Sequence, residues 1–292
     1  MAVYDRRYGP YEGRLTPRRT RFLVLPAYSY QEVFASKAFI VFLALWGVWA
    51  LLVLPILIYL PHNLGALESI GLDPEALKGV FEINASKALG FFMIPSTIVA
   101  YLTALVLGPA LISSDLRNNG LPLYLSRPFG RWEYVLGKSA VMLIMLSLVT
   151  WIPGMLLFLF QCYMGGWTWI KQYWSVGFGV FMTSWIWITL LCVISLAISA
   201  YVKWKPVARL SLILIFIVLP SIGQVINLIL RTDWGSIIDM RGMVTIVGAT
   251  LFGLPNNSAI PVPAAWLSIL SFSAFCIVLM AKKIRAYEVV KS

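Results

Sequence analysis

Few residues of this chain could do catalytic chemistry, and their spacing builds no catalytic centre. The sequence of 292 residues holds one histidine, His62, and three cysteines, none of them in a C-x-x-C pair. A histidine-based metal or nucleophilic centre needs further ligands or a partner base, so neither can be built within one chain. No Asp, Glu, Lys, Arg or His falls deep in an apolar segment, where proton relays and ion-coupled carriers usually hold such groups. We therefore expect no enzymatic activity from this chain.

The segment GRWEYVLGKS (130–139) comes close to a phosphate-binding loop but fails its spacing. Six residues separate Gly130 from Gly137, whereas that loop has four between its glycines, a strand before it and a helix after it. No strand is predicted before Gly130. We expect no cofactor in this chain, and any ATP-driven work would use ATP and Mg²⁺ bound to a separate subunit.

The most organised polar stretch is ISSDLRNNGLPLYLSRPFGRWEYVLGK (112–138), a loop between two long apolar segments. Asp115 and Arg117 end the first of these segments at the water boundary, and Gly120 suits a left-handed helix stop. The run LPLYLS supplies a short apolar and aromatic wedge that can enter a groove on a soluble partner. Three basic residues flank the wedge: Arg127, Arg131 and Lys138. The alternative interpretation is a basic loop that only fixes membrane topology.

Composition predicts the elements that hold this loop. Hydrophobic residues make up 60% of the chain and charged residues 12%, with a mean hydropathy of +0.84, which is typical of an integral membrane protein. Apolar runs of about 20 residues can cross a bilayer as helices. The sequence therefore predicts an all-α protein with six transmembrane helices, at about 38–60, 89–112, 136–160, 175–200, 208–230 and 263–281.

The basic residues predict the orientation. With six spans both termini lie on one side, and that side carries all but five of the 23 Lys and Arg residues. The five others are Lys78, Lys87, Lys171, Arg231 and Arg241. Because Lys and Arg accumulate in short cytoplasmic loops, we expect both termini in the cytoplasm and the chain in a bacterial-type inner (plasma) membrane. This confinement to inner loops and tails also argues against a nucleic-acid partner.

Two further segments flank the spans. Residues 1–37 are predicted to form a cytoplasmic tail that ends in a short interfacial amphipathic helix near 27–39, although the frayed start of the first span explains the same residues. Residues 38–281 form the transmembrane domain, and 282–292 form a cytoplasmic tail. An apolar run of about 13 residues at 243–255 is too short to span, so the outer region 231–262 is predicted to be re-entrant or interfacial.

The loop at 112–138 resembles the segment that follows the second span of ABC-2 type transporter permeases. The matching positions are Ile112, Ser113, Asp115, Arg117, Gly120, Leu121, Pro122, Leu123, Tyr124, Leu125, Ser126, Arg127, Pro128, Arg131, Tyr134, Gly137 and Lys138. Asn118 and Asn119 depart from the pattern, where a small or charged residue is more usual. The order of six spans, the inner termini and the re-entrant outer region extend the similarity over most of the chain.

The resemblance implies the permease subunit of an ATP-binding-cassette exporter. Its partners would be a soluble ATPase subunit that docks on the loop, a second permease copy or paralogue, and the lipid bilayer. The residues expected to couple the chain to the ATPase are Asp115, Arg117, Gly120, Leu121, Pro122, Leu123, Tyr124, Arg127 and Arg131. ATP-driven closure of the ATPases would then move the spans as rigid bodies.

The pathway would lie between two copies of the chain and take a hydrophobic or amphipathic cargo. Its candidate lining residues are Ser96, Thr97, Thr103, Ser211, Ser221 and Gln224, although helix packing uses the same residue types. An alternative function is a non-transporting scaffold or regulatory subunit of a larger membrane complex. A membrane enzyme acting on lipid is disfavoured, because paired carboxylates and metal ligands are missing near the predicted interfaces.

Overall fold

A computed structural model describes residues 29–30, 34–62, 85–118, 131–256 and 258–288. Nearly all of these residues are helical, and none of them forms a strand. Five stretches of this part are long and apolar enough to cross a membrane: Lys37–Tyr59, Gly90–Arg117, Glu133–Tyr201, Lys205–Leu230 and Val262–Lys283. The prediction of an α-helical chain with several membrane-compatible helices is confirmed.

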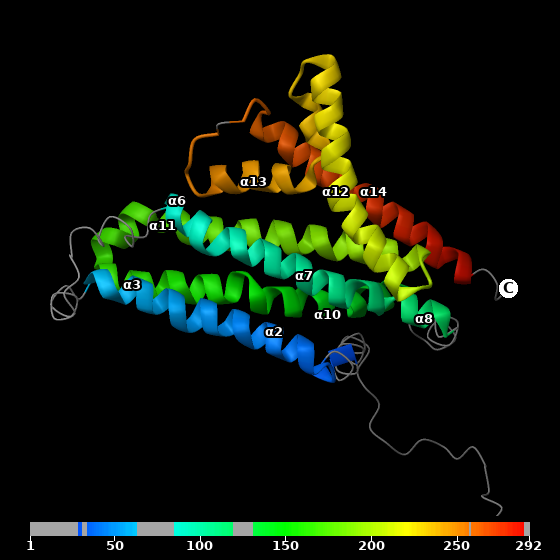
Figure 1. The fold of residues 1–292 in the computed structure, drawn as a ribbon, viewed down its shortest axis with the longest axis horizontal. Helices are drawn as coiled ribbons and strands as arrows, with labels where there is room; N and C mark the ends of the chain where they lie inside the picture. Colours follow the sequence, from blue (N-terminus) through cyan, green and yellow to red (C-terminus); the bar gives the residue numbers. More distant parts are fainter. Residues whose placement is uncertain (1–28, 31–33, 63–84, 119–130, 257, 289–292) are drawn as a thin grey trace, which may run out of the picture.

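The elements run in chain order as one long succession of helices (Figure 1). They are α2 (Lys37–Val48), η2 (Trp49–Val53), α3 (Leu54–His62), α6 (Ala85–Ala88), η3 (Leu89–Met93), α7 (Ile94–Leu111), α8 (Ser113–Arg117), α10 (Arg131–Val149), α11 (Trp151–Tyr201), α12 (Lys205–Leu230), η4 (Trp234–Ile238), α13 (Met240–Leu251) and α14 (Val262–Glu288).

Local sequence explains where several helices begin and end. The Ser36 hydroxyl accepts a hydrogen bond from the Phe39 amide at 3.4 Å and caps α2. Pro206 lies in the first turn of α12, where a missing amide proton costs nothing. Pro95 lies just after the π-helical turn η3, within the continuous helix formed by α6, η3 and α7. Arg231 ends α12 in the left-handed conformation (φ 50°).

The stretch from Glu133 to Tyr201 folds back on itself within α11 (Figure 1). The turn contains Gly166 at φ 68°, a conformation that glycine adopts without a Cβ penalty. Trp151 stacks on Trp185 with ring centroids 6.5 Å apart, although 34 residues of straight helix would separate them by about 50 Å. The two halves of α11 therefore run side by side, and the predicted spans 136–160 and 175–200 both lie in this stretch.

The core of the molecule lies between α7, α10 and α11, and α2 and α3 lie along one side of this group (Figure 1). Two buried tryptophans tie helices together through their indole nitrogens. Trp46 Nε1 donates to the Val149 carbonyl at 3.0 Å, and Trp187 Nε1 donates to the Thr97 carbonyl at 3.1 Å. These bonds satisfy polar atoms that would otherwise be costly to bury.

A second group of helices, α12, η4, α13 and α14, packs on the far side of α7 and α11 (Figure 1). Gly223 of α12 and Gly235 of η4 pack so closely that a Cβ on Gly223 would lie 2.5 Å from the Gly235 carbonyl oxygen. Asn227 closes this contact, since its Oδ1 accepts from the Gly235 amide at 2.7 Å and its Nδ2 donates to Ser236 Oγ at 2.8 Å.

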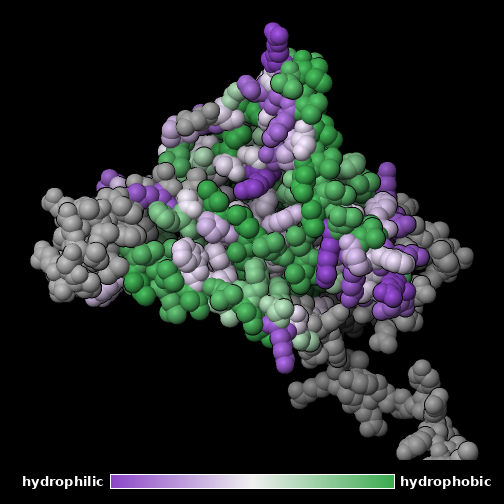
Figure 2. Space-filling model, viewed as in Figure 1, coloured by the Kyte–Doolittle hydropathy of each residue, from purple (hydrophilic) through white to green (hydrophobic). Residues whose placement is uncertain are grey.

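Much of the surface of α12 is left uncovered by the rest of the described chain. Only Ala208, Leu212 and Gly223 are buried, and the helix projects away from the bundle with a largely hydrophobic surface (Figures 1 and 2). Leu228 is 81% exposed and Ile217 is 58% exposed. A surface of this kind requires lipid or another apolar partner.

The remaining predicted segments can be compared with the structure only in part. The structure describes 29–30 and 34–39 of the predicted interfacial helix near 27–39. Ser29 and Tyr30 are helical, but Ser36 is extended and α2 begins separately at Lys37. The outer region 231–262 contains η4 and the short apolar helix α13. α14 continues as a helix to Glu288, into the segment 282–292 that is predicted to be a cytoplasmic tail. The position of this segment in the cytoplasm stays a prediction.

Candidate functional site

The segment predicted to bind an ATPase lies between α8 and α10. Six of its predicted contact residues fall outside the described part of the chain: Gly120, Leu121, Pro122, Leu123, Tyr124 and Arg127. Arg117 is exposed at the end of α8, and Arg131 is the first residue of α10. The structure therefore describes the two helices that hold the segment, and these show how its ends are fixed.

Asp115 of α8 is bound to two residues of α10. Its Oδ2 atom lies 3.0 Å from Lys138 Nζ and accepts a hydrogen bond from Tyr134 Oη at 2.7 Å. The Lys138 and Asp115 side chains are 8% and 16% exposed, and Tyr134 is fully buried. Lys138 Nζ also lies 5.8 Å from the centroid of the Tyr134 ring, within cation–π range. The cluster Asp115–Tyr134–Lys138 thus joins the two sides of the segment.

A serine pair holds the other side of α8. Ser199 Oγ, near the end of α11, accepts hydrogen bonds from the Ile112 amide at 3.0 Å and the Ser113 amide at 2.8 Å. Ser113 Oγ lies 3.1 Å from Ser199 Oγ and contacts the Val202 carbonyl. These amides belong to the junction where α7 ends and α8 begins, so their usual helical partners are missing. Ser199 supplies a partner within the buried core.

The two clusters together fix α8 against α10 and α11. A displacement of the segment between α8 and α10 would therefore be passed to α10 and α11, because the buried contacts at its ends resist local rearrangement. This arrangement bears on the expected role of Asp115. Its carboxylate is directed to Tyr134 and Lys138 and is 16% exposed, so a coupling role would be exercised through these contacts with α10.

Lys138 and Ser199 were not among the candidate site residues. Lys138 was predicted only to flank the loop as a basic residue. Asp115, Tyr134 and Lys138 belong to one motif, and this could have indicated that they contact one another. Ser199 lies 86 residues from Ser113 and gives no local signal, because serines of this kind are common in apolar helices.

The candidate pathway residues divide into two groups. Ser96 and Thr103 on α7 have no exposed surface, so neither can contact cargo in this conformation. Ser96 Oγ donates to the Met93 carbonyl at 2.9 Å, while Thr103 Oγ1 has no hydrogen-bond partner. Thr97 is half-buried and lines a small crevice with Thr245 and Arg241, between α7 and α13.

The other three candidates lie on α12. Ser221 and Gln224 are exposed and Ser211 is half-buried. The Ser211 and Ser221 hydroxyls donate to the carbonyls four residues earlier, at 2.9 and 2.7 Å. Such bonds satisfy a hydroxyl within an apolar helix. These residues are therefore available to a partner or a cargo, and the structure does not bring them together with Thr97.

Comparison with models of known protein families and with curated proteins finds no match to this chain. Among the described residues, no three His, Cys, Asp or Glu side chains lie close enough together to hold a metal ion.

Proposed function

We propose that this chain is the transmembrane permease subunit of an ATP-binding-cassette transporter of the ABC-2 type. It works as an exporter of a hydrophobic or amphipathic substrate, and a separate soluble ATPase subunit binds ATP and Mg²⁺. One observation carries the proposal: the segment that holds the ABC-2-like motif is fixed by buried contacts at both of its ends. The segment at 119–130 joins α8 to α10, and the Asp115–Tyr134–Lys138 cluster ties these helices together.

In this proposal the chain crosses the membrane six times with both termini in the cytoplasm. The stretch Glu133–Tyr201 crosses twice, consistent with its length of 69 residues and the turn at Gly166. The short helix α13 enters the outer leaflet without crossing, since its 12 residues span about 18 Å. This orientation places the 119–130 segment on the side where a soluble ATPase can reach it.

A second permease copy covers part of the exposed face of α12. The support for this step is the composition of that face between residues 210 and 230, where Ser221 and Gln224 interrupt an otherwise apolar exposed surface. Polar groups on a lipid-facing helix are unfavourable, and a partner helix or a water-filled pathway relieves the cost. Thr97, Arg241 and Thr245 supply further polar groups near α13 for the head of an amphipathic cargo.

The experiment is a double substitution in the wedge, Leu123→Asp with Tyr124→Asp. Burying two carboxylates in an apolar groove costs several kcal/mol, and every 1.4 kcal/mol lowers affinity tenfold, so ATPase retained on the membrane should fall at least about tenfold. Membrane insertion should be unchanged. The matched control reverses three charges in the C-terminal region, Lys282→Glu, Lys283→Glu and Arg285→Glu, and should retain the ATPase. A double variant that binds the ATPase and transports like the wild type would contradict the proposal.

A further inference from the structure

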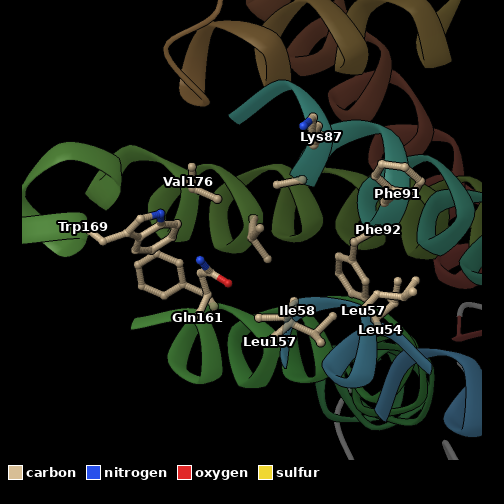
Figure 3. Close-up of a pocket in the computed structure, with 14 residues that line it drawn as sticks. Leu54, Leu57, Ile58, Lys87, Phe91, Phe92, Leu157, Gln161, Trp169 and Val176 are labelled. Atoms are coloured by element: carbon tan, nitrogen blue, oxygen red, sulfur yellow. The ribbon is translucent and has the colours of Figure 1, made fainter. Parts of the chain in front are cut away.

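A narrow apolar slot lies at the end of the bundle opposite α8, between α3, α6 and the two halves of α11 (Figure 3). The cavity itself is small, about 70 Å³, and it opens into a wider mouth that brings the empty space to about 690 Å³. Most of the wall is aliphatic or aromatic; Leu54, Ile58, Phe92 and Leu157 are among its residues. The proposed pathway residues do not line this slot, so it is a separate feature of the molecule.

The slot is not the result of loose packing around it. On one wall, a Cβ built on Gly154 would lie 2.5 Å from Phe92 Cε1 and 2.6 Å from Val180 Cγ1. On another, a Cβ on Gly177 would lie 2.6 Å from Phe158 Cε1. Because there is no room even for a methyl group at these two glycines, the helices cannot move closer together to close the space, and the slot is held open by the close packing of its own walls.

Two polar side chains of the wall have atoms without hydrogen-bond partners. Gln161 is 3% exposed, and its Oε1 atom accepts no hydrogen bond. Trp169 Nε1 is likewise buried and donates to no acceptor. Figure 3 shows the Gln161 carboxamide directed into the space between Trp169 and Phe92. Each unpartnered group costs about 1–3 kcal/mol, and a ligand that both donates and accepts would remove this cost.

A cation completes the wall. Lys87 on α6 is half-buried and lines the same slot (Figure 3). Within a membrane, an apolar slot with a hydroxyl-binding amide and an ammonium group matches one class of molecule. That molecule has an acyl chain for the slot, hydroxyl groups for Gln161 and Trp169, and a phosphate for Lys87.

We propose that the slot between α3, α6 and α11 binds an anionic phospholipid with a hydroxylated headgroup, phosphatidylglycerol being the simplest example. The acyl chain lies against Ile58, Phe92 and Leu157, and the headgroup meets Gln161, Trp169 and Lys87. The lipid acts as a fixed part of the fold at this end of the bundle. The proposal does not depend on the transport function, because none of its contacts involves α8, α12 or the 119–130 segment.

The test counts lipids retained by the purified full-length chain. The protein is reconstituted in vesicles of phosphatidylethanolamine and phosphatidylglycerol, re-extracted in detergent, washed, and measured by native mass spectrometry. We expect about one phosphatidylglycerol per chain in the wild type. Gln161→Leu removes the polar atoms and Val176→Phe fills the slot, so each should lower this occupancy at least about fivefold, a loss of roughly 1 kcal/mol in affinity.

The matched control is Gln172→Leu, which makes the same change at an exposed position of α11 and should keep the lipid. Lys87→Gln should shift the retained lipid from phosphatidylglycerol towards phosphatidylethanolamine. The proposal is overturned if the wild type retains no lipid, or if Gln161→Leu and Gln172→Leu retain it equally. The proposal is also overturned if Gln161→Leu is more stable than the wild type and retains the same amount of lipid. The Gln161 amide would then only destabilise the fold and would have no role in lipid binding.

Discussion

Removing the ammonium group of Lys138 tests whether the ends of the 119–130 segment are tied together by a buried ion pair. In Lys138→Met, the Asp115 carboxylate keeps the Tyr134 hydrogen bond at 2.7 Å but loses the cation at 3.0 Å. Breaking a buried ion pair by removing one partner costs about 3–5 kcal/mol. Because Asp115 keeps 16% exposure and one donor, we expect the lower limit, about 3 kcal/mol.

The assay is the apparent melting temperature of the detergent-purified protein, followed by the loss of the monodisperse peak in size-exclusion chromatography. At roughly 2 °C per kcal/mol for a chain of this size, the melting temperature should fall by about 6 °C. Asp115→Asn combined with Lys138→Met should recover part of this loss, because no buried charge is left without a partner.

Lys203→Met is the control, since it makes the same change at an exposed position of the connection between α11 and α12. It should alter stability by less than about 0.5 kcal/mol. If Lys138→Met melts within a degree of the wild type, or if the double variant is no more stable than Lys138→Met alone, then the ion pair does not hold α8 to α10. The rigid coupling inferred from it would then be wrong.

Two further predictions concern other contacts. Gly223→Ala places a Cβ 2.5 Å from the Gly235 carbonyl oxygen and should destabilise the packing of α12 on η4 by about 1–3 kcal/mol, whereas Gly47→Ala, with open space around it, should be neutral or stabilising. Tyr30 Oη donates to the Val141 carbonyl at 3.1 Å, and burial raises the pKa of Tyr30 from 10.0 to about 12. Because the folded state holds the phenol proton more tightly, this contribution is complete below pH 10 and is lost as the pH rises towards 12. Between about pH 9 and 12, the melting temperature of Tyr30→Phe should therefore fall less than that of the wild type. An equal fall in both proteins would contradict the assignment.

Composition and apolar run length were sufficient to place the long helices. The described helix α12 covers Lys205–Leu230 where 208–230 was predicted, and the membrane-compatible part of α14 covers Val262–Lys283 where 263–281 was predicted. Apolar runs of this length have few alternatives to helix in a membrane, so their positions follow from the sequence. The ends of helices are less predictable, and α14 continues to Glu288, beyond the predicted end of the last span at 281.

Contacts between distant helices could not be predicted from the sequence. Ser199 and Ser113 are ordinary residues of apolar segments, and only the packing of α11 beside α7 turns them into partners. Gln161 likewise reads as a residue near the end of a span, and its burial depends on the close approach of the two halves of α11 at Gly154 and Gly177. Asp115 was predicted to be a site residue. That its carboxylate is directed to α10 could not be predicted, because this depends on where Lys138 lies in the fold.

The central claim is that this chain works with a soluble ATPase, and the most direct measurement identifies its partners. The tagged full-length chain is extracted in mild detergent from its native membrane, purified and analysed by quantitative mass spectrometry. We expect a soluble ATPase subunit at one copy per permease chain, reduced at least about tenfold by Leu123→Asp with Tyr124→Asp. Recovery of the chain in a stable membrane complex that holds no ATPase would contradict the account and would favour a scaffold or regulatory subunit instead.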